Sequence, residues 1–204
     1  MVRVQRPGNA RPSFGRRVGH AAIDTICGLV DPAQRQRFLE AMSYTASSVS
    51  VVTTDGPAGR AGVTVSAMTS VSADTPMPSL LVCVHYLSSA AAAIRQNGVF
   101  CVNVLRDDQS HISDCFAGRT KSADGDKFSC ARWTRQATVA PRVIDPLVAF
   151  DCRLVQAIRV GTHYLFIGEA MEVFLDNGGD PLIYAKRAYG RPARLDQRLE
   201  QAAA

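Results

Sequence analysis

One run of hydroxyl-bearing residues is the segment of this chain best suited to binding chemistry. Gly62–Ser72 alternates over eleven residues, which predicts a single strand with two different faces. The more apolar face holds Val63, Val65, Ala67, Thr69 and Val71. The hydroxyl face holds Thr64, Ser66, Met68, Ser70 and Ser72. Because the hydroxyl face carries no charge, it suits a flat, polar ligand lying against the strand. The alternative is a strand rich in Thr and Ser only because these residues favour β-structure.

Ser88 and Ser89 open a predicted helix directly after an apolar strand. The first turn of a helix has free backbone N–H groups and the positive end of the helix dipole, so this position suits a phosphate. The alternative is that Ser88 simply caps the helix.

The remaining candidates stand in turns and loops. His163 lies in the turn Gly161–Tyr164, and Lys127 and Phe128 follow a loop that contains Gly and Asp. Tyr189 and Arg187 lie near the end of the folded region and could equally be ordinary surface residues. The four histidines are scattered and no Cys pair has C-x-x-C spacing, so we predict no metal site and free thiols.

These candidates are positioned by elements that the local pattern predicts. A helix Pro32–Met42 begins at the cap Asp31, and its Phe38, Leu39 and Met42 are expected to face a core. Helices are also predicted over 88–98 and 108–116, and strands over 49–54, 62–72, 79–85, 99–105, 146–160 and 162–175. The apolar run 79–85 predicts burial on both faces.

The order and spacing of these elements favour an antiparallel barrel. Most strands follow one another at hairpin spacing, and no G-x-G-x-x-G motif joins a strand to a helix. We therefore expect a mainly β protein with a few helices and no dinucleotide-binding domain of the βαβ type.

The charge of the chain is concentrated at its N-terminus. The net charge is +5, and residues 1–20 alone carry five arginines and no acidic residue, which leaves the rest formally neutral. We predict a basic, disordered extension over 1–30, a folded domain over 31–192 and a helical tail over 193–204. The neutral body argues against nucleic-acid binding. Without a secretory signal or an apolar span, we expect a cytoplasmic protein with no membrane partner.

Several segments together resemble the flavin reductase family, the short-chain reductases that serve two-component flavin monooxygenases. The resemblance runs from about Phe38 to Tyr189. It is carried by the order and spacing of residues 49–54, 62–72, 78–84, 94, 98–105, 116–118, 126–128 and 161–169.

The resemblance implies a split β-barrel of the Greek-key type that forms a homodimer. It also implies an NAD(P)H:flavin oxidoreductase that reduces FMN or FAD with NADH or NADPH and supplies reduced flavin to a partner monooxygenase. Alternatives on the same barrel are an FMN-containing oxidase of the pyridoxamine-phosphate-oxidase type and a non-enzymatic flavin or haem carrier. The oxidase would need more Arg and Lys than the Ser88 region offers.

The resemblance further implies a set of site residues. His163 would lie beside the nicotinamide as the catalytic residue. The flavin would contact Thr64, Val65, Ser66, Ala67, Ser70, Ser88, Ser89, Lys127, Phe128 and Tyr189. Two departures are visible: the family often has Thr where this chain has Ala90, and Asp where it has Thr162.

Overall fold

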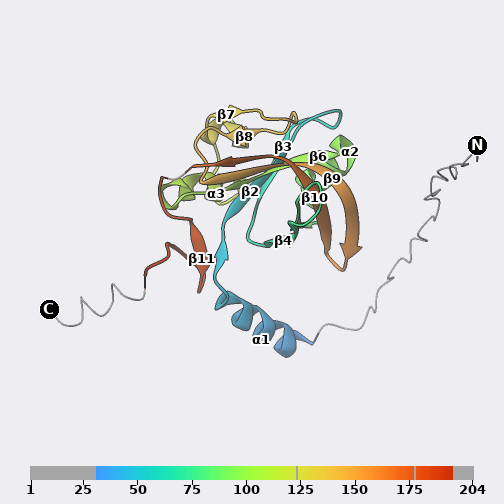
Figure 1. The fold of residues 1–204 in the computed structure, drawn as a ribbon. Coiled ribbons are helices and arrows are strands. Elements are labelled where there is room, and N and C mark those ends of the chain that lie inside the picture. The colour runs from blue at the N-terminus through green and yellow to red at the C-terminus, as the bar shows by residue number, and fades with distance from the viewer. Residues whose placement is uncertain (1–30, 123, 177, 195–204) are drawn as a thin grey trace, which may run out of the picture.

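The computed structural model describes residues 31–122, 124–176 and 178–194, so the predicted N-terminal extension and most of the C-terminal tail lie outside the described residues. Three helices and two short 3₁₀ turns accompany the strands (Figure 1). The helices and turns are α1 (Pro32–Ser43), α2 (Ser89–Asn97), α3 (Ser110–Phe116), Asp107–Gln109 and Lys127–Cys130. The strands are β1 (Ser47–Ser48), β2 (Ser50–Thr54), β3 (Ala61–Val65), β4 (Met68–Ser72), β5 (Ser79–His85), β6 (Val99–Val104), β7 (Trp133–Thr134), β8 (Arg142–Val143), β9 (Val148–Val160), β10 (His163–Leu175), β11 (Ile183–Ala185) and β12 (Ala188–Gly190).

The main sheet curls back on itself. Its seven strands are antiparallel in the order β3-β2-β6-β9-β10-β5-β4, so β3 and β4 form its two edges. These edges are nevertheless joined by only Ser66 and Ala67. Two residues cannot span an open seven-stranded sheet, because neighbouring strands lie about 5 Å apart. The sheet must therefore curl until β3 and β4 come close at this crossover, although these two edges do not pair within the described residues. A curled sheet that stays open between its edges confirms the predicted split barrel.

Helix α2 and the long hairpin β9–β10 contribute side chains to the core of this barrel. Ser88 caps α2, and Gly98 ends it in a left-handed conformation (φ 70°), as the sequence predicts. Its Ala91 and Ile94 belong to the same core cluster as Phe100 on β6 and Phe166 on β10, the two strands that flank β9. The hairpin β9–β10 turns at Gly161 and provides the longest strand pair, so local signals located the central elements correctly.

The prediction of a single strand over Gly62–Ser72 is wrong in one respect, because this segment forms two strands, β3 and β4. The break at Ser66–Ala67 carries the chain from one sheet edge to the other, and burial along β4 no longer alternates. Beyond it, Met68 packs against the core while Val71 is 52% exposed. The pattern was continuous, but closure of the barrel interrupts the strand.

Helix α1 forms where it was predicted, and Asp31 Oδ1 accepts a hydrogen bond from Ala33 N–H at 2.9 Å. The expectation that its apolar residues face a core is wrong. Phe38 is 63% and Met42 49% exposed, and no residue of α1 is buried. The helix lies beside the barrel at its lower end rather than on it (Figure 1). Its apolar side therefore has no partner within the described chain.

Gly168 on β10 is required by packing, and we predict that Gly168→Ala destabilises the protein. A Cβ atom at this position would lie 2.5 Å from Phe100 Cζ and 3.0 Å from Cys152 Cβ. Overpacking of this kind costs roughly 1–3 kcal/mol in the free energy of unfolding, measurable by urea denaturation. Gly190→Ala is the control, since a Cβ atom there would have nothing within 4 Å, and its stability should not change. Equal stabilities of the two variants would contradict this packing argument.

Candidate functional site

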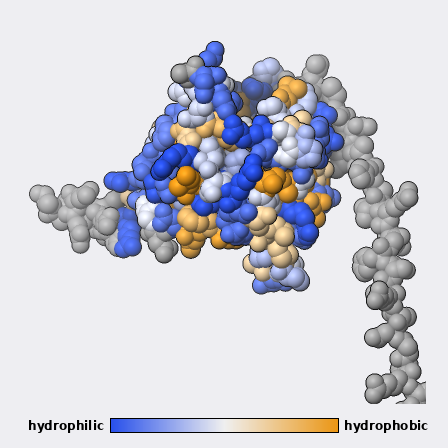
Figure 2. Space-filling model, turned by 90° about the horizontal axis from the view of Figure 1, so that it is seen from above, coloured by the Kyte–Doolittle hydropathy of each residue, from blue (hydrophilic) through white to orange (hydrophobic). Residues whose placement is uncertain are grey.

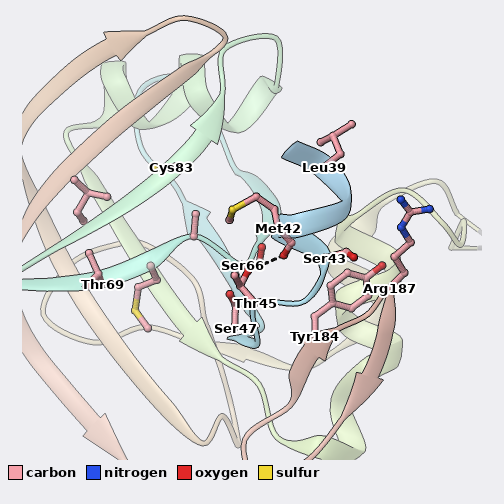
Figure 3. A pocket seen from close by; sticks show the side chains of 13 residues that line it. Leu39, Met42, Ser43, Thr45, Ser47, Ser66, Thr69, Cys83, Tyr184 and Arg187 are labelled. Carbon is pink, nitrogen blue, oxygen red and sulfur yellow. Dashed lines mark hydrogen bonds between the residues drawn. The ribbon is translucent and has the colours of Figure 1, made fainter. Parts of the chain in front are cut away.

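A cavity of about 690 Å³ lies where α1, the β3–β4 crossover, β5 and the β11–β12 turn meet (Figure 3). Its walls combine apolar side chains with hydroxyls and a single cation. The lining residues are Leu39, Met42, Ser43, Thr45, Ser47, Ser66, Ala67, Met68, Thr69, Leu81, Cys83, Tyr184 and Arg187.

Strand β5 provides one wall of the cavity. The prediction that this strand is buried on both faces is wrong, because only alternate residues are buried, and Leu81 and Cys83 instead face the cavity. Cys83 N–H donates to the carbonyl of Ala67 at 3.0 Å, which fixes the crossover against β5. Partial burial raises the pKa of the Cys83 thiol, so this wall is uncharged at neutral pH. An uncharged, polarisable surface of this kind suits a flat aromatic ring.

Hydroxyl groups form the middle of the cavity. Thr45 Oγ1 donates to Met42 O at 2.7 Å (Figure 3). Ser43 Oγ donates to Glu40 O at 2.6 Å, so both hydroxyl protons are already used. Ser47 and Ser66 make no side-chain hydrogen bond within the described part of the chain. Their hydroxyls are therefore available to a ligand, as the sequence pattern suggests for Ser66.

A second, smaller cavity of about 180 Å³ adjoins the first, shares Ser66 and Tyr184 with it, and is also bordered by Thr64, Val65 and Tyr189. The polar groups there bond to one another. Thr64 Oγ1 donates to Ser113 O at 2.7 Å, and Tyr189 Oη donates to Asp114 Oδ1 at 2.8 Å. Burial raises the pKa of Tyr189, which keeps its hydroxyl protonated and in place. These residues tie β3 and β12 to α3, and their predicted contact with a ligand stays a prediction.

Five other predicted contact residues do not line the large cavity. Ser70 and Ser89 are exposed, and Ser88 Oγ accepts from Ala90 N–H at 3.3 Å as the helix cap. Lys127 Nζ donates to Phe116 O at 3.2 Å. Phe128 is buried, with its ring centroid 5.0 Å from those of Phe116 and Trp133.

His163 lies at the end of the same sheet surface that forms the β5 wall. It stands directly opposite His85 in the β10–β5 pair, with ring centroids 5.1 Å apart, and its Nδ1 is 3.0 Å from Thr162 Oγ1. Residues two apart in a strand share a face and are separated by about 7 Å. His85 and His163 therefore lie one step beyond Cys83, next to the cavity and accessible to solvent.

Sequence reasoning missed the cavity residues that come from α1 and β1, and it named Arg187 of the β11–β12 turn as a candidate without placing it in the site. Pairing of Ser47 with Tyr184 brings β1 against β11, and this small sheet carries Arg187 to the cavity. The strands involved are two or three residues long, so no local periodicity could reveal them. Within the described residues, no helix is long and apolar enough to cross a bilayer.

Comparison with known proteins adds to this geometry. Residues 42–193 match the model of the Flavin reductase like domain. The chain is 43% identical over 155 residues to FMN reductase (NADH) RutF of Ancylobacter novellus, a match that covers 76% of this chain and 83% of that protein. It is 41% identical over 158 residues to FMN reductase (NADH) RutF of Acinetobacter baylyi, with 78% and 82% covered.

Solved structures show the same fold. The flavin reductase PheA2 superposes with a TM-score of 0.71 at 28% identity, covering 81% of this chain and all of that one. BorF, the flavin reductase component of a bacterial two-component tryptophan halogenase, superposes with a TM-score of 0.70 at 31% identity, covering 78% and 99%.

Proposed function

The chain belongs to the Flavin reductase like domain family, and we propose that it reduces FMN with NADH and releases the reduced flavin. The observation that carries this proposal is the large, almost uncharged cavity at the Ser66–Ala67 crossover, which has the size and chemistry for an isoalloxazine ring. The relatives named FMN reductase (NADH) support the choice of FMN and NADH over FAD and NADPH.

The reaction requires little acid–base catalysis by the protein. A hydride leaves C4 of the nicotinamide and forms the N5–H bond of the flavin, so NADH is oxidised as the flavin is reduced. The cofactors supply the redox chemistry, and the protein supplies placement and polarity. Ser66, Ser47 and the uncharged Cys83 wall would hold the flavin ring flat, with one ring face open to the nicotinamide.

The nicotinamide is proposed to lie over the flavin on the His163 side. His163 and His85 border the Cys83 end of the cavity and are reachable from solvent. An imidazole there can hydrogen-bond the carboxamide of the nicotinamide and orient its C4 toward the flavin.

A steady-state assay tests the proposed function. Purified protein is mixed with each of the four pairings of NADH or NADPH with FMN or FAD, while nicotinamide absorbance is followed. We expect NADH oxidation that depends on added flavin and is fastest with FMN. No oxidation with any of the four pairings would refute the reductase. A protein that retains FMN through dialysis would instead support the oxidase alternative.

The proposal includes a homodimer in which a second copy covers the apolar side of α1. Phe38 and Met42 are four residues apart and share one side of this helix, and both are exposed. In the view of Figure 2, by contrast, the apolar patches are small and separated by hydrophilic side chains. Large apolar side chains grouped on one helix are typical of a protein–protein interface.

We predict that Phe38→Glu converts the dimer to monomer, because it places a charge in the apolar contact. Sedimentation velocity at several concentrations measures the shift. Gln36→Glu is the matched control, since it adds the same charge to another exposed position of the same helix. A wild-type protein that is monomeric at all concentrations, or a Phe38→Glu dimer as stable as wild type, would contradict this interface.

The reduced flavin is proposed to serve a flavin-dependent oxygenase. The name of the structural relative BorF describes a reductase component of a two-component system, which supports this assignment. Transfer between two proteins requires that the flavin can leave, and three residues that line the cavity, Ser66, Ala67 and Thr69, are exposed to solvent.

A further inference from the structure

The turn that carries Arg187 has an unfavourable backbone conformation. Lys186 and Arg187 have φ values of 50° and 62° and connect β11 to β12 as a two-residue hairpin loop. Such loops favour Asn and Gly, because other residues at positive φ cost about 1–2 kcal/mol each. This chain instead places two long cationic side chains there.

Contacts with the end of α1 compensate for this cost and fix the turn. Lys186 N–H donates to Ser43 O, and the Lys186 ammonium lies 5.4 Å from the centre of the Tyr44 ring. Lys186 is thus used to hold the turn against α1. The Arg187 side chain then extends along the end of this helix, beside Tyr184 and Ser43 (Figure 3).

Arg187 makes no ion pair or side-chain hydrogen bond within the described part of the chain, although six other arginines there pair with carboxylates. It is also the single charged residue among those lining the cavity. In Figure 3, Arg187 and Tyr184 lie on one side of the cavity, Cys83 and Thr69 on the other, and Ser66 and Ser47 between them. The cavity therefore has an uncharged end and a cationic end.

We propose that Arg187 stabilises the negative charge that the flavin ring acquires on reduction; this inference rests on the proposed function. The hydride brings two electrons and one proton, so the neutral ring becomes an anion, with the charge shared between N1 and the C2 oxygen. A cation fixed at that edge binds the reduced ring more tightly than the oxidised ring. With the ring against Ala67 and Cys83, the edge near Ser66 faces Arg187.

The test compares the binding of oxidised and reduced flavin rather than activity alone. Arg187→Met removes the charge, and the dissociation constants of FMN and riboflavin are measured aerobically and, after chemical reduction, anaerobically. We expect the variant to bind both reduced flavins about 10-fold more weakly, as for loss of one charged hydrogen bond, and to bind the oxidised flavins within about 2-fold of wild type. A 10-fold change in this ratio corresponds to a shift of about 30 mV in the potential of the bound flavin.

Two further variants complete the design. Arg187→Lys keeps the charge and should retain most of the preference for reduced flavin, whereas Arg37→Met removes an exposed cation of α1 that does not line the cavity and should leave the preference unchanged. Equal weakening of oxidised and reduced flavin, or no weakening, would overturn the proposal. A loss restricted to FMN would also overturn it, because it would show that Arg187 binds the phosphate. Failure of the reductase itself would appear separately, as no turnover by the wild-type protein.

Discussion

Ala67→Trp is expected to lower turnover with FMN by roughly 100-fold, because an indole at the crossover occupies the space assigned to the flavin ring. Ala67 is exposed and lines the cavity between β3 and β4, so a larger side chain can be accommodated without disturbing the core. Burial of an aromatic ring contributes several kcal/mol to binding, and most of this is lost when the site is filled.

The measurement is FMN binding by fluorescence quenching together with the KM for FMN. Val139→Trp is the control, since it adds the same side chain to an exposed loop position that does not line the cavity. If Ala67→Trp bound FMN as tightly as the control, the ring could not lie at the crossover.

His163→Ala is expected to reduce kcat/KM for NADH by about 100-fold while the affinity for FMN stays unchanged. The physical reason is positional: a nicotinamide that is no longer held over the flavin spends less time with C4 near N5, and a displacement of about 1 Å can cost this much. The imidazole stands at the edge of the cavity, beyond Cys83, and makes no contact that the barrel core requires.

His111→Ala provides the comparison for this prediction, because His111 is likewise exposed but lies on α3, outside the large cavity. The readout is the separate measurement of KM for NADH, KM for FMN and kcat. A His163→Ala variant with an unaltered KM and kcat for NADH would exclude His163 from the nicotinamide site.

The elements that the sequence predicted well are those with local signals. Helix α2 is bounded by a serine cap and a glycine in the left-handed region, and the β9–β10 hairpin is marked by Gly161 between two long β-rich runs. The hairpin spacing and the family resemblance together were sufficient for the split barrel. The helix and the hairpin depend on residues that are close together in the sequence. The family resemblance depends on several segments in the same order and spacing.

The features that were not predicted from the sequence depend on contacts between residues far apart in the chain. Gly62–Ser72 alternates without interruption, and only closure of the barrel requires the break at Ser66–Ala67. The apolar residues of α1 look the same in sequence whether they face their own core or another molecule. Arg187 reaches the cavity through pairing of β1 with β11, which joins segments more than 130 residues apart.

One anaerobic experiment tests the central claim most directly. The protein is mixed with FMN and NADH in the absence of oxygen, and the absorbances of nicotinamide and oxidised flavin are recorded together. We predict that the two absorbances fall in parallel, with one FMN reduced for each NADH consumed, far faster than in the absence of protein. Oxidised flavin that persists beside unconsumed NADH would contradict the assignment of this chain as a flavin reductase.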